Sequence, residues 1–149
     1  SKEALFLQLL DGWLSRLNEE LLKIESTASS VQEAMFKMVD VAGSLIEPAE
    51  NNYGIIFEFW SKARHEEKVW QGTISYFERY RKFFMEILKK GVKKGELQPF
   101  DISLYSQLMV SLAVGVLLQA VLDPKSTNWK ASLEKMVDTI LEGLKRTQS

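Results

Sequence analysis

The sequence predicts an all-α fold, a six-helix orthogonal or antiparallel bundle, on three observations. Apolar residues recur at three- and four-residue steps along almost the whole chain, which is the periodicity of amphipathic helices. No stretch shows the sustained apolar-polar alternation between turn residues that is typical of strands. The 149 residues include only 3 Pro, and 46% of them are apolar, so long helices with a substantial shared core are expected. We therefore expect one domain over residues 1–149.

The first two predicted helices are separated by a short polar segment. Residues 2–25 carry a broad apolar face, which indicates contact with more than one neighbouring helix. Ser30 and Glu33 match the S-x-x-E capping box, in which the serine hydroxyl and the glutamate carboxylate satisfy free backbone N–H groups. The second helix is therefore predicted over residues 31–47, and Pro48 is expected to end it.

The third and fourth predicted helices differ in length and character. Residues 53–64 form a short segment that is dense in aromatic side chains. Residues 69–94 form a long amphipathic helix whose last turns are rich in Lys, where cations complement the negative end of the helix dipole. Gly95 is the expected stop, because glycine readily adopts the left-handed conformation that follows many helices.

The last two predicted helices follow a turn and a proline. Asp101 is the expected N-cap of the fifth helix, residues 102–122, because aspartate accepts a hydrogen bond from a free backbone N–H group. Pro124 ends that helix. Ser126 or Thr127 is expected to cap the sixth helix, which has an apolar stripe opposite a charged face.

Residues 108–122 form a run of fifteen residues without a charge. The run is shorter than the roughly 20 residues that span a bilayer, so a buried helix is expected and no membrane contact. Such a helix could be the core helix of a monomer, or the last two helices of two copies could form a four-helix bundle. We favour the homodimer, because Ser111 and Gly115 would let another helix approach closely. The predicted dimer interface comprises Ser111, Gly115, Leu118, Leu122, Leu133, Met136, Val137, Ile140 and Leu144.

The composition argues against catalytic and metal chemistry. The chain has no Cys and one His, which leaves no thiol nucleophile and no Cys/His zinc site. It also lacks the E-x-x-H pair of di-iron bundles, the G-x-S-x-G nucleophile turn and both glycine-rich nucleotide-binding motifs. We therefore expect no enzyme, no cofactor and no metal. His65 lies among polar residues and is expected to be solvated or capping, with a hydrogen bond in a pocket as the alternative.

The charge balance argues against nucleic-acid binding by this chain itself. Nineteen Lys and Arg against twenty Asp and Glu give a formal net charge of -1, whereas nucleic-acid affinity comes largely from neutralised phosphates. The predicted helix over residues 69–94 is basic, but apolar residues interrupt its cations, so a solvated face is favoured over a nucleic-acid patch. The opening residues lack the apolar run of a signal peptide, and we expect a cytoplasmic protein.

Aromatic side chains concentrate on the third and fourth predicted helices. Core packing is the ordinary explanation of such a pattern. A pocket for an apolar or aromatic small molecule is the alternative, because Trp and Tyr carry polar groups that need partners when they are buried. The group comprises Phe57, Phe59, Trp60, Trp70, Tyr76, Phe77, Tyr80, Phe83 and Phe84.

Four segments of the chain resemble, in their order and spacing, parts of one known family. The opening SKEALF resembles the start of the long helix that follows the recognition helix in TetR-type transcriptional regulators. FEFWSKAR at residues 57–64 resembles the family's short helix, and FMEILKKGVKKGELQPFD at residues 84–101 resembles its helix end and Gly-Glu turn. LMVSLAVGVLLQ at residues 108–119 resembles its first dimerisation helix. The family's N-terminal helix-turn-helix is absent, so we expect the body of a larger regulator.

The resemblance implies a fold like the TetR C-terminal domain and the function of an effector-binding and dimerisation domain. It implies a homodimer through the last two helices, a small-molecule effector among the central helices, and operator DNA bound only through the absent head. The first helix, anchored by Trp13 and Leu17, would transmit ligand binding. The implied ligand-binding residues are Met35, Phe36, Val39, Phe57, Trp60, Tyr76, Tyr80, Phe84, Tyr105, Met109 and Leu112, with Tyr76 and Tyr80 orienting the ligand. The rival hypothesis is a helical module that binds a protein partner in a groove and has no small-molecule cavity.

Overall fold

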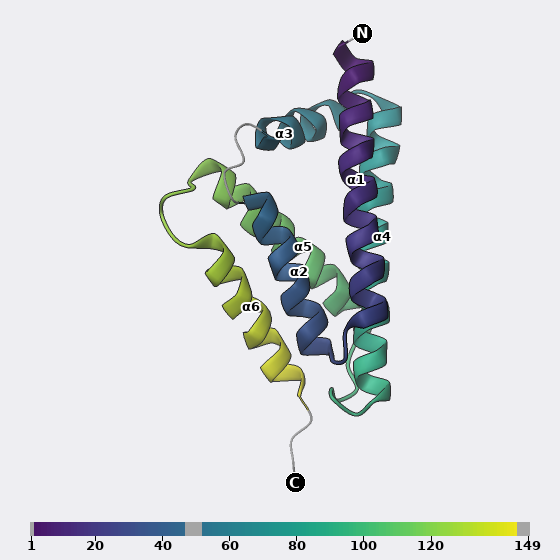
Figure 1. Cartoon of the computed structure of the whole chain (residues 1–149), viewed down its shortest axis with the longest axis vertical. Coiled ribbons are helices and arrows are strands. Elements are labelled where there is room, and N and C mark those ends of the chain that lie inside the picture. Colours follow the sequence, from purple (N-terminus) through teal and green to yellow (C-terminus); the bar gives the residue numbers. More distant parts are fainter. Residues whose placement is uncertain (1, 47–51, 146–149) are drawn as a thin grey trace.

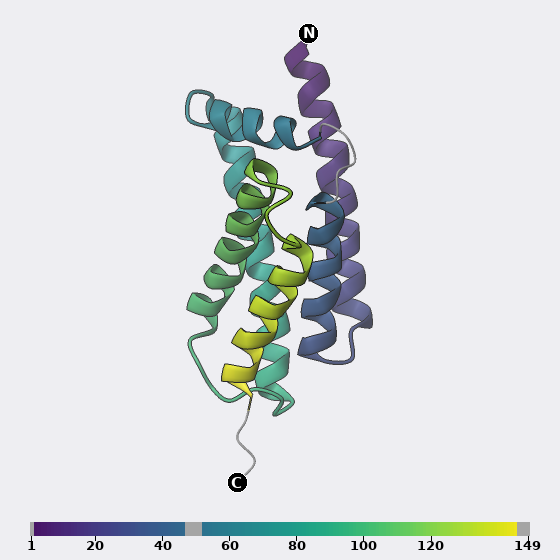
Figure 2. The same cartoon turned by 90° about the vertical axis from the view of Figure 1, so that its left-hand side faces the viewer.

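The computed structural model describes residues 2–46 and 52–145, and over these residues it consists of six helices and no strand (Figure 1). The all-α prediction is therefore confirmed. The helices are α1 (Lys2–Thr27), α2 (Val31–Ile46), α3 (Asn52–Ala63), α4 (Glu67–Lys93), α5 (Ile102–Leu122) and α6 (Trp129–Leu144). Figures 1 and 2 both show α3 lying across the upper end of the bundle, while the other five helices run along its length.

The predicted helix limits agree with the observed ones to within two residues, but one cap was assigned wrongly. Asp101 caps α5 as predicted, because its side chain accepts a hydrogen bond from Leu104 N at 3.0 Å. The N-cap of α6 is Asn128, whose side chain accepts from Ala131 N at 3.0 Å. Asparagine caps as well as serine does, and the Ser126 hydroxyl instead donates to the carbonyl oxygen of Asp123.

The start of α2 contains half of the predicted capping box. Glu33 N donates to Ser30 Oγ at 3.1 Å, as the motif requires. The return bond is shifted by one residue, because Glu33 Oε2 accepts from Ser29 N at 2.8 Å and also from the Ser29 hydroxyl. These bonds from Ser29, together with the nearby Lys37 ammonium, lower the pKa of Glu33 to about 2.

Helices α1 and α4 run side by side in one direction (Figure 1), and three contacts fix their register at a separation of 65 residues. The Glu25 carboxylate lies 3.8 Å from Lys90 Nζ. Lys94 Nζ donates to the carbonyl oxygen of Ser29 at 3.4 Å. Val31 N donates to Glu96 Oε2 at 2.9 Å, so a residue after α4 supplies the acceptor for a free N–H group at the start of α2.

The turn after α4 also joins α6 at the lower end of the molecule. Gly95 has φ 77°, a left-handed conformation that favours glycine, and it ends the helix region as predicted. Gln98 N donates to the carbonyl oxygen of Leu144 at 2.9 Å. A Cβ atom at Gly91 would lie 2.3 Å from Val31 Cγ2, so the absence of a side chain there lets α4 approach the start of α2. We use the name basal junction for the four contacts Glu25–Lys90, Ser29–Lys94, Val31–Glu96 and Gln98–Leu144, together with the turn at Gly95.

Two apolar clusters hold the helices together. The larger one joins all helices except α3 and contains the most deeply buried side chains, among them Met35, Leu88 and Leu141. The smaller one lies at the upper end, where Leu17, Ala63 and Val69 from α1, α3 and α4 are buried together. The expected anchoring of α1 through Leu17 is thus observed, whereas the Trp13 side chain lies outside the described part of the structure.

A matched pair of leucines tests the assigned core. Leu88 is 0% exposed and Leu22 is 57% exposed, both inside helices. We expect Leu88→Ala to lower the free energy of unfolding by about 2–5 kcal/mol, because it removes buried methyl groups and leaves a cavity. Leu22→Ala should change it by less than about 0.5 kcal/mol. Urea denaturation of both variants measures this difference, and equal losses would contradict the core assignment.

Candidate ligand-binding site

Aromatic side chains of α3 and α4 meet at the upper end of the bundle, close to α1. The Phe57 and Trp60 rings pack edge to face with centroids 5.7 Å apart, and the Phe77 ring lies tilted at 6.3 Å from Trp60. Trp60 also packs against the smaller apolar cluster, to which α1 contributes Leu17. We call Phe57, Trp60, Tyr76, Phe77 and Tyr80, together with Leu17, Ala63 and Val69, the upper aromatic cluster.

Two tyrosines supply the polar groups of this cluster. Tyr76 and Tyr80 are one helical turn apart on α4, and therefore share a face. Burial raises the pKa of Tyr80 to about 12, and the neighbouring Tyr76 adds to the effect. Burial also raises the pKa of Tyr76, and so does the Asp11 carboxylate, whereas Arg79 acts in the opposite direction. Both phenols therefore stay protonated at neutral pH and can donate hydrogen bonds.

The Tyr80 hydroxyl is available to an added molecule. Tyr80 packs against both apolar clusters, yet no hydrogen bond joins its hydroxyl to another described residue. Every fully enclosed side-chain nitrogen or oxygen of the described residues does have a hydrogen-bond partner. The Tyr80 hydroxyl therefore keeps some accessible surface, and it is a donor in a largely apolar setting without an acceptor among the described residues.

The predicted ligand-binding residues do not form one group. Phe57, Trp60, Tyr76 and Tyr80 lie in the upper aromatic cluster. Six others belong to the larger core cluster or pack directly against it, and they are Met35, Val39, Phe84, Tyr105, Met109 and Leu112. The Tyr105 ring packs on Phe100 with centroids 4.9 Å apart, near the start of α5. Tyr80 links the two groups, since it contacts both clusters.

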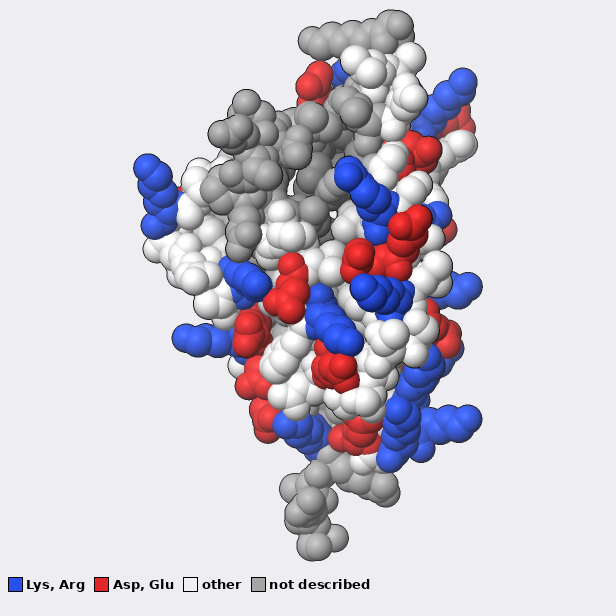
Figure 3. Space-filling view, in the orientation of Figure 1, with Lys and Arg blue, Asp and Glu red and all other residues white. Residues whose placement is uncertain are grey.

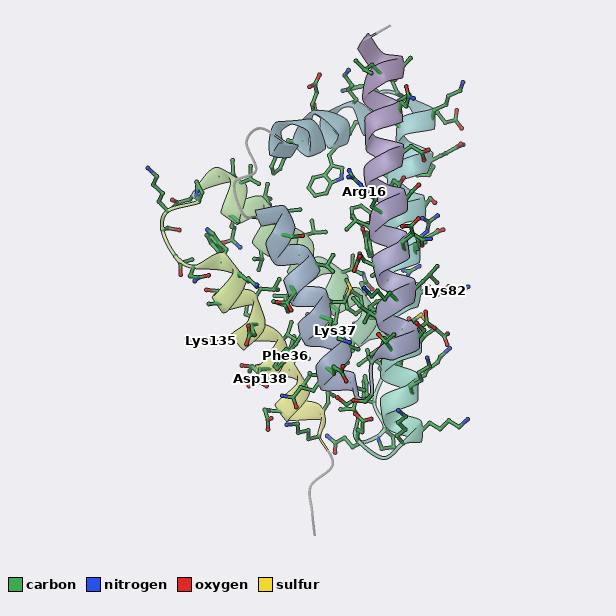
Figure 4. All side chains as sticks on the ribbon, viewed as in Figure 1. Arg16, Phe36, Lys37, Lys82, Lys135 and Asp138 are labelled. Carbon is green, nitrogen blue, oxygen red and sulfur yellow. The ribbon has the colours of Figure 1, made fainter. Side chains whose placement is uncertain are left out.

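Phe36 lies apart from both groups. Figure 4 shows it on the side of α2 that faces α6, near Lys135 and Asp138, whereas Met35 faces the core. Met35 and Phe36 point in different directions because adjacent residues on a helix are about 100° apart, and the place of Phe36 in a ligand site stays a prediction. The same view shows Arg16 extending from α1 toward the side on which α2 and α3 lie.

Four members of the upper aromatic cluster are absent from the predicted ligand-binding set, and they are Leu17, Ala63, Val69 and Phe77. Leu17, Ala63 and Val69 are buried there. Leu17 belongs to a visible apolar stripe, but its pairing with α4 depends on the register of two helices far apart in sequence. Trp70, grouped with the aromatics in the sequence, is 52% exposed and lies outside the cluster. The side chain of Phe59 lies outside the described part of the structure.

Helix α5 presents a second candidate surface, an apolar stripe that faces solvent. Its members recur at alternating steps of four and three residues and so share one face. Leu104 is 57% exposed and Leu122 is 74% exposed. No atom lies within 4 Å of the position that a Cβ atom would take at Gly115, so the surface there is open. The α5 stripe comprises Leu104, Leu108, Ser111, Gly115, Leu118 and Leu122.

The opposite face of α5 packs inside the chain. Ser106, Met109, Val116 and Ala120 are buried there. The uncharged stretch is the whole of α5, Ile102–Leu122 (21 residues), so the length argument from residues 108–122 alone was wrong. Of the described helices, α5 has the length and the apolar composition to cross a membrane, and 22% of its most apolar window is buried within the chain. Core helices of water-soluble proteins pass the same test. The described residues of the chain therefore leave the α5 stripe, on the other face, exposed.

The predicted interface residues on α6 divide between surface and core. Figure 2 shows α5 and α6 side by side on one face of the bundle. Met136 is exposed there, and Ile140 is half-buried. Leu133, Val137 and Leu144 are buried in the larger core cluster, because α6 turns its apolar stripe onto α2 of the same chain. These three residues offer no surface to a second copy in this conformation.

Charges of both signs are interspersed on the face shown in Figure 3. Asp40 of α2 and Lys130 of α6 form an ion pair at 3.2 Å. In the basic last turns of α4, Lys89 lies 3.6 Å from Glu86, and the contact of Lys90 with Glu25 is described above. This pairing agrees with a solvated face. His65 is exposed, and no group of three or more metal-ligating side chains occurs among the described residues.

Comparisons with known proteins agree on one family and one fold. The family model for the C-terminal part of BetI-type transcriptional repressors matches residues 31–146. A solved structure assigned as a transcriptional regulator from Pseudomonas aeruginosa PAO1 superposes with a TM-score of 0.73 at 18% sequence identity. The match covers 87% of this chain and 64% of that chain, so this chain spans less than two thirds of that regulator. No curated protein matches the sequence.

Proposed function

The chain belongs to the family of BetI-type transcriptional repressor C-terminal domains, and on that premise we propose that it binds a small apolar or aromatic effector at the upper aromatic cluster. The effector would alter operator binding by helix-turn-helix heads that precede α1 in the full regulator. The observation that carries the proposal is the Tyr80 hydroxyl, which lies among aromatic rings and has no hydrogen-bond partner among the described residues. A few donors within a mainly apolar lining are typical of small-molecule sites.

The position of α1 supports a route from effector to operator. Leu17 of α1 packs in the upper aromatic cluster, while the end of α1 is held at the basal junction by the Glu25–Lys90 pair and the bond to Ser29. A molecule that separates Leu17 from Trp60 would therefore tilt α1 about its lower end. Two heads must meet half-sites about 34 Å apart, so a tilt that changes their spacing weakens operator binding, and operator DNA weakens effector binding equally.

The α5 stripe supports self-association. A second copy of the same stripe is a self-complementary cover, as a two-fold symmetric dimer requires, and Gly115 with Ser111 would allow the two helices to approach closely. We propose a homodimer through α5, with Met136 and Ile140 of α6 at its margin. In such a dimer the second copy, and not a membrane, covers the α5 stripe. We therefore propose a cytoplasmic location. The family comprises regulators, and the proposal includes no catalytic step.

A matched pair of tryptophans tests the effector site. In a thermal-shift screen of small aromatic compounds, a ligand that binds only the folded state at a hundred times its dissociation constant stabilises the protein by about 2.7 kcal/mol. We expect hits with the unmodified chain and with Trp70→Ala, whose side chain is largely exposed. Trp60→Ala should lose the shift, measured against its own ligand-free melting temperature. Shifts absent from all three proteins would favour the rival protein-binding module.

A matched pair of exposed leucines tests self-association. We expect a dimer at micromolar concentration in sedimentation velocity. Leu118→Glu should give a folded monomer, because it would bury two carboxylates in the apolar interface. Leu22→Glu, at an exposed position on α1, should remain dimeric. A monomeric unmodified chain, or a dimer that survives Leu118→Glu, would rule out the α5 stripe as the interface.

A further inference from the structure

The hydrogen-bonding groups of the upper aromatic cluster indicate which class of molecule it accepts. We infer that the effector is a neutral aromatic molecule bearing a carbonyl-type oxygen, and that the Tyr80 hydroxyl donates a hydrogen bond to that oxygen. This inference rests on the effector site proposed above and adds the chemistry of its ligand.

The described hydroxyls of the cluster are phenols, which can donate and accept, and donation is the stronger of the two because a phenol O–H is acidic and its oxygen is a weak acceptor. The Tyr80 hydroxyl has no partner among the described residues, and a donor in apolar surroundings gains most from an acceptor on a ligand. Thr73 is the other buried hydroxyl on this part of α4, and it already donates to the carbonyl oxygen of Val69 at 2.8 Å. Because the Thr73 hydroxyl proton is already used, Tyr80 and not Thr73 is the donor for a ligand oxygen.

Charges of both signs lie near the two phenols. The Asp11 carboxylate and the Arg79 guanidinium act on Tyr76 in opposite directions, and Arg79 lies over the Tyr76 ring at 5.8 Å from its centroid. An anionic ligand would face the Asp11 carboxylate as well as the Arg79 guanidinium, and it would leave water for a wall formed by Leu17, Trp60 and Val69. Burial of a charge without a paired partner is costly. A neutral acceptor avoids both penalties.

The apolar wall selects the body of the molecule. Trp60 is held edge-on by Phe57 and lies tilted against Phe77. Aromatic rings favour such edge-to-face and offset contacts with further rings. A flat ring can therefore extend the stack while its oxygen points to Tyr80, whose ring packs at the boundary of both apolar clusters.

Three small probes of similar size separate these contributions. Acetophenone carries a ring and a neutral carbonyl, ethylbenzene carries the ring alone, and benzoate carries an anionic oxygen pair. Isothermal titration of the full chain should give the tightest binding for acetophenone. Ethylbenzene should bind roughly three- to tenfold more weakly, the change expected for one neutral hydrogen bond. Benzoate should bind more weakly than acetophenone.

The Tyr80→Phe variant tests the donor, and Tyr105→Phe is its matched control on the Phe100 side of the core. Tyr80→Phe should lower acetophenone affinity to that of ethylbenzene and leave ethylbenzene affinity unchanged, whereas Tyr105→Phe should change neither. Equal affinities of the unmodified chain for acetophenone and ethylbenzene would overturn the inference while leaving the effector site intact. Tightest binding of benzoate, or full acetophenone affinity in Tyr80→Phe, would overturn it too. If no probe binds, the proposed site fails, and the inference fails with it.

Discussion

The hydrogen bond from Val31 N to the Glu96 carboxylate joins parts of the chain that are 65 residues apart, and the other contacts of the basal junction gather around it. The glycine turn that precedes Glu96 brings the chain back beneath α2, and the next residues bind the end of α6 through Gln98 and Leu144. Helices α1, α2 and α6 are thereby tied to one loop. Because the loop also leads into α5, this junction sets how α1 stands relative to the helix proposed to form the dimer.

The upper end of the molecule is held by a different kind of contact. There, α1 meets α3 and α4 through apolar and aromatic side chains such as Leu17 and Trp60, which have no directional bonds to fix their spacing. When such contacts separate, they expose apolar surface, but a bound ring buries most of that surface again. The net cost in free energy of admitting the ring is therefore small. A fixed lower end and an adaptable upper end would together let a small molecule act on α1, the helix through which we propose that the effector signal passes.

Periodicity was sufficient to predict the six helices, and local chemistry predicted the Asp101 cap and the Gly95 stop. The sequence was not sufficient where a feature depends on contacts between distant segments. The sequence shows that both α5 and α6 have apolar faces, but not that α6 turns Leu133, Val137 and Leu144 onto α2 of the same chain. Likewise, the resemblance groups Phe57 and Met109 in one predicted site, whereas Phe57 lies with Trp60 at the upper end and Met109 lies in the larger core cluster. Helix tilt and register depend on contacts between helices that are far apart in the sequence, and a local sequence pattern does not specify them.

The central claim is that a ligand acts on the upper half of α1 while the basal junction stays fixed. Amide hydrogen exchange with and without saturating acetophenone tests this most directly. The account predicts altered exchange in α1 around residues 4–17 and in α3, with no change at residues 24–27 or at Val31, whose N–H group is bound to Glu96. Altered exchange at the basal junction or in α5, with the upper half of α1 unaffected, would contradict it.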